Sequence, residues 1–243
     1  MKEFLLITGA SSGIGRQCAI QLSKDYNLIL CARREDKLLE TKSMCENPDN
    51  HLIFQCDLSD INNLEDILID FLREQEVTVE KFLHCAGDKG ISLLSSCSVD
   101  FIKNCFNINL FSAMLIIKVL SSRRFNQKKL NNIVLLSSLN TKVSSKATSI
   151  YCTSKAAIEA FVKEMAVELA PNVRINSILP GLLASDMTRQ IYENDSNIIE
   201  ITSKYPLGVG TFEDIANMVE FLFSSKAKWI TGQQISVDGG ASA

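Results

Sequence analysis

The sequence lacks the features that mark several classes of protein. None of its eight cysteines belongs to a Cys-x-x-Cys pair, so zinc-ribbon and thioredoxin-like sites have no support and no metal site is expected. No apolar run reaches the roughly 18 residues that a membrane span requires. The opening segment MKEFLLITGASSG has neither the apolar core nor the cleavage site of a secretory signal. These absences predict a cytoplasmic protein with reduced cysteines.

The chain also lacks an excess of charge of either sign. Its 25 basic and 28 acidic residues give a formal net charge of −3, which offers no electrostatic reason to expect nucleic acid or an anionic membrane as a partner. Linkers, repeats and low-complexity segments are missing too. The 243 residues, 46% of them hydrophobic, therefore fit a single domain over residues 1–243 with one large core.

Short apolar runs alternate with longer amphipathic stretches along the whole chain. The runs are Phe4–Thr8, Asn27–Cys31, His51–Gln55, Lys81–His84, Asn132–Ser137, Val173–Ile178 and Gln234–Val237. The helical patterns lie near 14–24, 35–46, 60–75, 99–120, 150–169 and 212–224. This alternation predicts a Rossmann-type α/β fold, a doubly wound parallel sheet of about seven strands with helices on both faces.

One region breaks the alternation. Residues 182–205 are polar, weakly helical and longer than an ordinary connection. They follow the predicted strand Val173–Ile178, and ligands of open α/β sheets bind at the carboxyl ends of strands. We therefore expect a substrate lid near 182–205, with an ordinary surface excursion as the alternative.

A glycine-rich turn joins the first predicted strand to the first helix. The cofactor-binding candidates in it are Gly9, Ser11, Ser12, Gly13, Ile14 and Gly15. Missing Cβ atoms permit a tight turn and let backbone N–H groups approach a pyrophosphate, and the helix N-terminus adds a favourable dipole. A purely structural turn is the alternative, but the flanking strand and helix favour a dinucleotide.

The end of the second predicted strand bears on the type of cofactor. NAD enzymes usually place a carboxylate there for the ribose 2′-OH, whereas an arginine suits the 2′-phosphate of NADP. Here Ala32 is followed by Arg33, Arg34 and Glu35. NADP(H) is therefore preferred over NAD(H), with Arg33 as the main contact. The alternative is that both arginines are solvated residues at a helix start.

Tyr151 and Lys155 are four residues apart and share one face of a predicted helix. A neighbouring ammonium lowers the pKa of a tyrosine from its usual value near 10, so Tyr151 could exchange a proton with a carbonyl or an alcohol. Ser138 ends the preceding strand, and its hydroxyl could hold the substrate oxygen. Ser137 is the rival donor, which the sequence leaves open.

Together these motifs resemble the short-chain dehydrogenase/reductase family in its compact, single-domain branch. The matching residues are Thr8-Gly9, Gly13-Ile14-Gly15, Asp57-Leu58, Ala86-Gly87, Asn109, Ser138, Tyr151, Lys155, Pro180-Gly181 and Ile230-Thr231-Gly232-Gln233. They occur in the family's order over nearly the whole length, and as a set they are highly specific.

The resemblance implies a catalytic tetrad and hydride transfer between a nicotinamide and a carbonyl carbon. Asn109 would position a water in the proton relay, together with Ser138, Tyr151 and Lys155 as the other members. Lys155 would also bind the nicotinamide ribose. The remaining implied cofactor contacts are Asp57 and Leu58 at the adenine, Ala86 and Gly87 along the cofactor, and Tyr151, Pro180 and Gly181 near the nicotinamide.

Two positions depart from the family pattern. His84 and Cys85 stand where the family commonly has two asparagines, which could alter hydrogen bonds around the cofactor. Ser185 stands where a threonine contacts the carboxamide, and it keeps the hydroxyl. Neither change removes a member of the tetrad, so the resemblance predicts an active enzyme over a cofactor-sensing protein without catalysis.

The substrate is less determined. The overall resemblance is to 3-oxoacyl-(acyl-carrier-protein) reductases, and a basic cluster before the fifth predicted strand would suit an acidic carrier protein. The cluster consists of Arg123, Arg124, Lys128 and Lys129. A solvated helix end is the alternative for it. The loop 139–146 is polar, so a sugar, polyol or hydroxy acid is a live alternative to a 3-oxoacyl thioester.

The helices near 99–120 and 150–169 are apolar on more than one face, as buried helices are. The resemblance implies that subunits pack through these helices and the C-terminal tail. We therefore expect a homotetramer, or a homodimer, with packing within one chain as the alternative.

Overall fold

The computed structural model describes residues 2–184 and 203–243. Its core is a parallel sheet of seven strands in the order β3-β2-β1-β4-β5-β6-β7. The strands are β1 (Phe4–Thr8), β2 (Asn27–Ala32), β3 (Leu52–Gln55), β4 (Lys81–His84), β5 (Asn132–Leu136), β6 (Arg174–Pro180) and β7 (Gln234–Val237). The predicted doubly wound α/β fold is confirmed, and each predicted strand lies within about two residues of its observed bounds.

The strands form where the apolar runs are because both faces of the sheet are covered. All five residues of β5 are buried, as are the last four of β1. In register, Leu5 lies beside Leu28 of β2 and Lys81 of β4. Continuous burial explains why these runs are uniformly apolar instead of alternating with polar residues.

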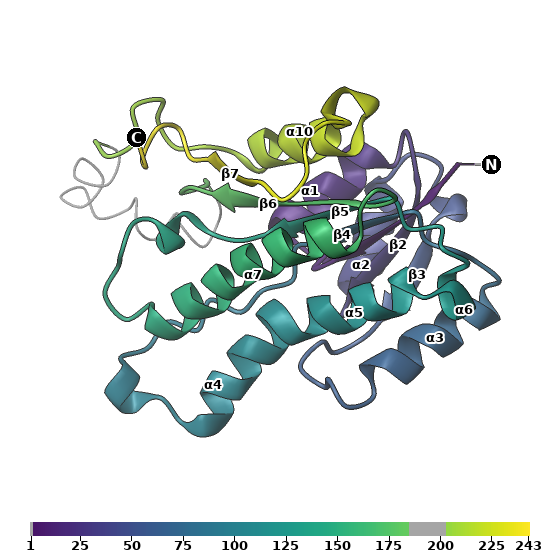
Figure 1. Cartoon of the computed structure of the whole chain (residues 1–243), viewed down its shortest axis with the longest axis horizontal. Coiled ribbons are helices and arrows are strands. Elements are labelled where there is room, and N and C mark those ends of the chain that lie inside the picture. Colours follow the sequence, from purple (N-terminus) through teal and green to yellow (C-terminus); the bar gives the residue numbers. More distant parts are fainter. Residues whose placement is uncertain (1, 185–202) are drawn as a thin grey trace.

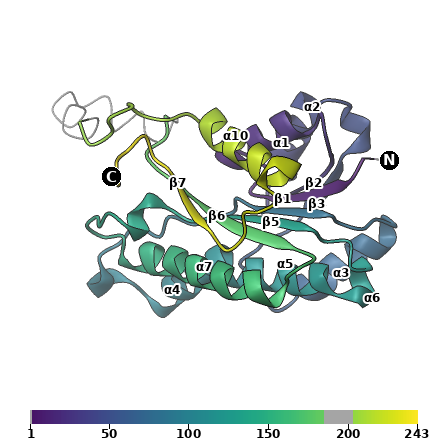
Figure 2. The same cartoon turned by 45° about the horizontal axis from the view of Figure 1, so that its top comes forward.

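Helices form a layer on each side of the sheet (Figure 2). One layer contains α1 (Gly13–Leu22), α2 (Glu35–Met44) and α10 (Phe212–Phe223). The other contains α3 (Leu64–Glu74), α4 (Val99–Phe106), α5 (Ser112–Ser121), α6 (Arg123–Asn126) and α7 (Ser149–Glu168). Each layer buries its own apolar cluster against the sheet, and this burial is the main source of stability in such a fold.

The predicted helix near 99–120 is continuous but not uniform. Between α4 and α5, residues Asn107–Phe111 form a π-helical turn, a geometry that is rare and often found at functional sites. Three short 3₁₀ turns, Pro48–Asn50, Leu94–Ser96 and Ser225–Ala227, lie in connections, and a fourth, Leu139–Thr141, follows β5.

The combined helix Val99–Ser121 has a mean hydropathy of 1.4 over its most apolar 18-residue window, half of which is buried inside the fold. By length and composition it could cross a membrane, so the expectation that no stretch reaches that length is wrong for this helix. Its burial against the sheet is the property of a core helix, which meets the same criterion.

The strand order reverses next to β1. From β1 the chain first adds β2 and β3 on one side, and then returns to place β4 to β7 on the other. At this switch point the connections diverge and leave a crevice at the carboxyl ends of the strands. In Figure 1 these ends lie toward the left, on the side where α7 begins and where the C-terminus lies.

Candidate functional site

A cavity of about 700 Å³ opens at the carboxyl ends of β1 to β4. Its lining includes most of the predicted cofactor contacts: Gly9, Ser11, Ser12, Gly13, Ile14, Gly15, Arg33, Asp57, Leu58, Ala86 and Gly87. The cavity lies at the switch point of the sheet, the position where α/β folds bind ligands. The structure thus brings together residues that are separated by up to 78 positions in the chain.

The glycine turn has no room for side chains at two positions. A methyl group on Gly9 would lie 2.8 Å from Ala86 N, and one on Gly15 would lie 2.3 Å from Gly9 O. Gly9 also has a φ of +69°, a conformation that other residues adopt at a cost. These contacts bring the backbone of the turn against the loop after β4 and against the start of its own helix. The first N–H groups of α1 therefore start beside the cavity, where an anion is favoured.

The β2–α2 corner forms the other end of the cavity. Arg33 is exposed and lines it together with Arg34, which is the N-cap residue of α2. Asp57 also lines the cavity, but its Oδ1 accepts hydrogen bonds from the backbone and hydroxyl of Ser59. The corner therefore presents two guanidinium groups, a donor set that suits an anionic group on a ribose.

At its inner end the cavity borders two members of the predicted tetrad. A methyl group on Gly87 would lie 3.4 Å from both Lys155 Nζ and Asn109 Oδ1. Lys155 is 4% exposed, and its Nζ donates to the carbonyl of Leu136 at 2.8 Å. Gly87 is thus the point at which the lining of the cavity meets the predicted catalytic residues.

Ser138 lies opposite Tyr151, whereas Ser137 points into α7. The hydroxyl of Ser138 is close enough to Tyr151 to lower the pKa of its phenol, and it accepts from Asn140 N at 3.2 Å. Ser137 instead contacts Glu159 Oε1 at 2.6 Å and the carbonyl of Lys155 at 3.2 Å. Geometry therefore separates the two serines that the sequence could not distinguish. Both follow β5, Ser138 is still extended, and successive side chains of an extended segment point to opposite sides.

The electrostatics of the tyrosine–lysine pair differ from the sequence-based expectation. Burial raises the pKa of Tyr151, and the hydrogen bond with Ser138 opposes that rise. Burial also lowers the pKa of Lys155 to about 8. The amine lies 6.0 Å from the centre of the Tyr151 ring and donates elsewhere, so loss of solvent dominates both groups.

Asn109 lies at the centre of the π-helical turn and is fully buried. Its Nδ2 contacts Ser154 Oγ at 2.8 Å, the carbonyl of Asp88 at 3.0 Å and Cys105 Sγ at 3.3 Å. Its Oδ1 accepts from Asp88 N at 2.7 Å. The side chain is therefore fixed between the loop after β4 and the helix that contains Tyr151.

His84, which replaces a family asparagine, is also fully buried. Its Nδ1 is 2.9 Å from Thr8 Oγ1, and Thr8 Oγ1 in turn accepts from Ala86 N at 3.3 Å. Burial, followed by the charge of Lys155, lowers the pKa of His84 to about 3. The ring is thus neutral at physiological pH and connects the start of the glycine turn to the loop after β4.

The predicted contacts after β6 lie at a separate hollow. Gly181 follows β6 and donates its N–H to Val237 O at 3.0 Å. Pro180 is the last residue of β6. A second cavity of about 220 Å³ lies next to them, lined by residues such as Leu182, Leu207 and Asp238. Most of the predicted lid near 182–205, including Ser185, lies outside the described residues.

The basic cluster does not flank the cavity within one chain. Its residues lie in and just after α6, which precedes the amino end of β5, whereas the cavity is at the carboxyl ends of the strands. Figure 1 shows α6 at the opposite end of the molecule from the start of α7. The arrangement follows from the parallel sheet, in which every helix-to-strand connection lies at the amino edge.

Sequence reasoning missed several residues that line the cavity, among them Asp88, Asn104 and Phe212. Asp88 follows Ala86-Gly87 directly, and its carboxylate accepts from Asn104 Nδ2 at 2.8 Å. Its place after a predicted cofactor contact was a usable signal. Phe212 begins α10, over a hundred residues away, and no local pattern could place it here.

Among the described residues, no group of three or more histidine, cysteine, aspartate or glutamate side chains could hold a metal ion. All eight cysteines are free, and five of them are buried. A doubly wound sheet with this glycine turn and cavity defines the class of dinucleotide-binding α/β proteins.

The comparisons with known proteins identify the family. A family profile described as Enoyl-(Acyl carrier protein) reductase matches residues 9–242. The human (3R)-3-hydroxyacyl-CoA dehydrogenase is 30% identical over 97% of this chain and 94% of its own length. The 3-oxoacyl-(acyl-carrier-protein) reductase FabG of Rickettsia bellii is 32% identical over 97% of this chain and 95% of its own.

A solved structure of 4-hydroxyisoleucine dehydrogenase complexed with NADH has a TM-score of 0.90 and 26% sequence identity, and the match covers 99% of this chain and 98% of that one. The chain belongs to the short-chain dehydrogenase/reductase family and is an oxidoreductase that uses a nicotinamide dinucleotide.

Proposed function

We propose that the protein is an NADP(H)-dependent carbonyl reductase or alcohol dehydrogenase whose catalytic residues are Asn109, Ser138, Tyr151 and Lys155. The observation that supports this most directly is the meeting point at Gly87. Gly87 lines the cavity, and a methyl group on it would lie 3.4 Å from both Lys155 Nζ and Asn109 Oδ1. Lys155 shares a helix with Tyr151, whose pKa is raised by burial and lowered by its interaction with Ser138.

The residues present fit a dinucleotide. The turn leaves no space for a Cβ at Gly9 and Gly15, so its backbone can approach a pyrophosphate closely. The bound nicotinamide supplies or accepts the hydride. Ser138 would orient the substrate oxygen through its hydroxyl. Tyr151 would donate its phenolic proton to that oxygen in reduction, and would accept it back in oxidation.

Lys155 and Asn109 would support this proton transfer. The Lys155 ammonium would bind the nicotinamide ribose and stabilise the phenolate that Tyr151 becomes after donation. Asn109 would hold the relay in place, since each of its polar atoms is bonded to the surrounding loop and helix. Burial of the site excludes bulk water, which strengthens these charge interactions.

NADP(H) is preferred over NAD(H) in this proposal because of the β2–α2 corner. Arg33 and Arg34 both line the cavity there, and no carboxylate ends β2. A 2′-phosphate would therefore meet two guanidinium groups, while a bare 2′-OH would find no carboxylate acceptor at the strand end.

A 3-oxoacyl thioester is the first candidate substrate. Two relatives of about 30% identity over nearly their full length act, by name, on 3-oxoacyl or 3-hydroxyacyl thioesters. The distant position of the basic cluster in the single chain gives no support to a carrier protein over a smaller thioester.

A sugar, polyol or hydroxy acid is the second candidate. The 4-hydroxyisoleucine dehydrogenase that shares the fold has, by its name, a small polar substrate. The loop that includes Leu139–Thr141 is polar, and its Lys142 is held at 3.0 Å from Ser236 Oγ of β7.

The proposal includes a single catalytic domain over residues 1–243 with a lid near 182–205, which would close over the substrate at the carboxyl edge of the sheet. It also includes a cytoplasmic location and a homotetramer or homodimer. In this proposal a subunit interface would cover exposed apolar side chains such as Trp229, which is 96% exposed, and Val167, which is 80% exposed.

The proposed function can be tested by following NADPH and NADH consumption with a set of carbonyl compounds. The set should contain an acetoacetyl thioester, keto-sugars, 2-keto acids and simple ketones. We expect turnover with NADPH and an acetoacetyl thioester to exceed turnover with the other pairs. The Tyr151→Phe variant should lose turnover by about a thousandfold or more, since general acid catalysis contributes roughly that much.

Cofactor affinity provides the control for that variant. Tyr151→Phe keeps the ring and removes only the hydroxyl, so its dissociation constant for NADPH should stay within about threefold of the wild-type value. Undiminished turnover would refute the role of Tyr151. A higher kcat/KM with NADH than with NADPH would refute the cofactor preference.

A further inference from the structure

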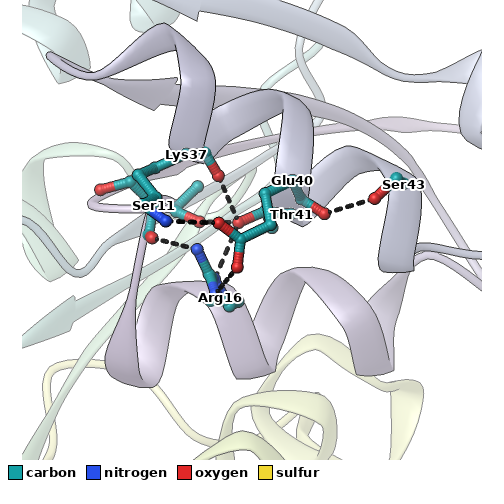
Figure 3. A network of polar contacts seen from close by, with 7 residues as sticks. Ser11, Arg16, Lys37, Glu40, Thr41 and Ser43 are labelled. Carbon is teal, nitrogen blue, oxygen red and sulfur yellow. Dashed lines mark hydrogen bonds and ion pairs between the residues drawn. The ribbon is translucent and has the colours of Figure 1, made fainter.

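Arg16 follows the last glycine of the turn, and its side chain is spread between the turn and α2. Its Nη2 donates to the carbonyl of Ser11 at 2.8 Å, and its Nε donates to Thr41 Oγ1 at 3.0 Å. Its Nη1 is 2.8 Å from Glu40 Oε1. Figure 3 shows Arg16 surrounded by these partners, with the turn on one side and α2 on the other.

Thr41 is the second contact between α2 and the turn. It is fully buried, and its Oγ1 lies 3.0 Å from the carbonyl of Ala10 and 2.9 Å from that of Lys37. The hydroxyl has one proton to give and accepts from Arg16 at the same time. Thr41 and Arg16 thus engage two successive carbonyl groups of the glycine turn, those of Ala10 and Ser11.

These bonds determine how the peptide groups of the turn are oriented. In a trans peptide the carbonyl and the following N–H point in opposite directions. Because the carbonyls of Ala10 and Ser11 face α2, the N–H groups of Ser11 and Ser12 face away from it. Both serines line the cavity, so their N–H groups are available to an anion there.

The same bonds hold the glycine turn at one end of the cavity at a set distance from the β2–α2 corner at the other end. Arg34 is the N-cap of α2, so any shift of α2 moves the corner that contains Arg33 and Arg34. The charge of Arg16 is balanced by Glu40, whose pKa is lowered by hydrogen bonds from Lys37 and then from Arg16. Arg16 therefore has a carboxylate partner on α2 and does not need the ligand's charge to balance its own.

We propose that Arg16 and Thr41 are positioning residues for the cofactor pyrophosphate, which they serve by holding the carbonyls of the glycine turn against α2. The inference rests on the proposed use of a dinucleotide. It concerns the pyrophosphate, which NADPH and NADH share, and so it does not depend on which of the two is preferred.

The test is a set of dissociation constants for the purified full-length protein with NADPH, NADH and adenosine 2′-monophosphate. The last ligand can occupy the Arg33 corner but has no pyrophosphate. Thr41→Val removes the hydroxyl with little change in volume, and Thr41→Ser retains it. Arg16→Met removes the guanidinium, and Lys37→Met is the control, because its side chain contacts Glu40 but not the turn.

Thr41→Val and Arg16→Met should each weaken binding of both dinucleotides by about tenfold or more, as expected when a hydrogen bond to a charged or buried group is lost. Binding of adenosine 2′-monophosphate should stay within about twofold. Thr41→Ser and Lys37→Met should match the wild type, and the KM for the dinucleotide should change more than kcat.

Unchanged dinucleotide binding in Thr41→Val and Arg16→Met would overturn the inference, as would an equal loss of adenosine 2′-monophosphate binding. If Arg16→Met does not fold, the comparison of Thr41→Val with Thr41→Ser decides the matter. A wild-type protein that binds neither dinucleotide would overturn the proposed function together with this inference. A wild-type protein that binds a dinucleotide, with equal affinity in Thr41→Val and Arg16→Met, would overturn only the inference.

Discussion

Burial brings the pKa of the Lys155 amine close to neutral pH. Its pKa is lowered to about 8, while burial raises the pKa of Tyr151 above its ordinary value. Tyr151 is therefore protonated throughout the neutral range and suited to donate a proton. Because Tyr151 stays protonated and uncharged over this range, the pKa of Lys155 sets the pH at which the tyrosine–lysine pair loses its positive charge.

The pH dependence of carbonyl reduction should follow from that lysine. Below about pH 8 the Lys155 ammonium is charged and, in the proposed mechanism, binds the ribose, and above that pH the charge is lost. We expect kcat/KM to be level below about pH 7 and to fall as the pH rises through about 8. In Lys155→Arg the group stays charged, so the descending limb should move by more than one pH unit upward, even if overall activity is lower. An identical limb in both proteins would contradict this assignment.

His84 should make the protein sensitive to acid. Its pKa is about 3 in the folded protein against a reference value of 6.5, so between these two values the unfolded chain binds a proton that the folded protein excludes. The free energy of unfolding should therefore fall as the pH drops from about 6.5 toward 3, by as much as about 4 kcal/mol from this residue.

Denaturant unfolding at pH 7 and pH 4 measures this effect. His84→Asn removes the titrating ring, so its loss of stability between the two pH values should be smaller than that of the wild type. Equal losses would mean that His84 does not contribute. The comparison isolates His84 because carboxylates and His51 titrate in both proteins.

At the level of single elements, the glycine turn depends on close backbone contact as well as on the positive φ of Gly9 and Gly13. Gly15 has an ordinary φ, yet a methyl group there would lie 2.3 Å from the backbone oxygen of Gly9. Gly208 combines the opposite properties: its φ is +78°, but an added methyl group would have nothing within 4 Å.

These two glycines form a matched pair of substitutions. Gly15→Ala should force the turn open, lower the free energy of unfolding by about 1–3 kcal/mol and weaken dinucleotide binding by at least tenfold. Gly208→Ala should cost about 1–2 kcal/mol through its positive φ and leave dinucleotide binding unchanged. Thermal unfolding and fluorescence titration would measure both effects. Wild-type cofactor affinity in Gly15→Ala would show that the close contact is not needed.

The π-helical turn is a second element whose local geometry matters. It interrupts the regular pattern between α4 and α5 and places Asn109 inside the fold. Ser112 Oγ donates to the carbonyl of Ile108 at 2.8 Å, so one carbonyl of the irregular turn finds a side-chain partner, as buried backbone groups require.

At the scale of the whole molecule, the exposed apolar residues bear on assembly. Trp229 is the sole tryptophan of the chain and is 96% exposed in the single chain. Size-exclusion chromatography with light scattering should give a mass near four times the 27.0 kDa of one chain. If Trp229 lies in an interface, its fluorescence should shift to longer wavelength when dilution separates the subunits. A 27.0 kDa species at micromolar concentration would refute the oligomer.

The sequence by itself determined the order and type of the elements, because apolar runs bounded by turn residues and strict alternation leave few other folds. It also predicted roles for Gly9, Gly15, Tyr151 and Lys155 from their local spacing, but not that burial would raise the pKa of Tyr151. The tertiary structure decided which residues face one another. It directed Ser138 to Tyr151 and Ser137 to Glu159, brought Phe212 to the cavity and set α6 at the far edge. Such contacts depend on how strands and helices pack, and packing joins residues that no local pattern connects.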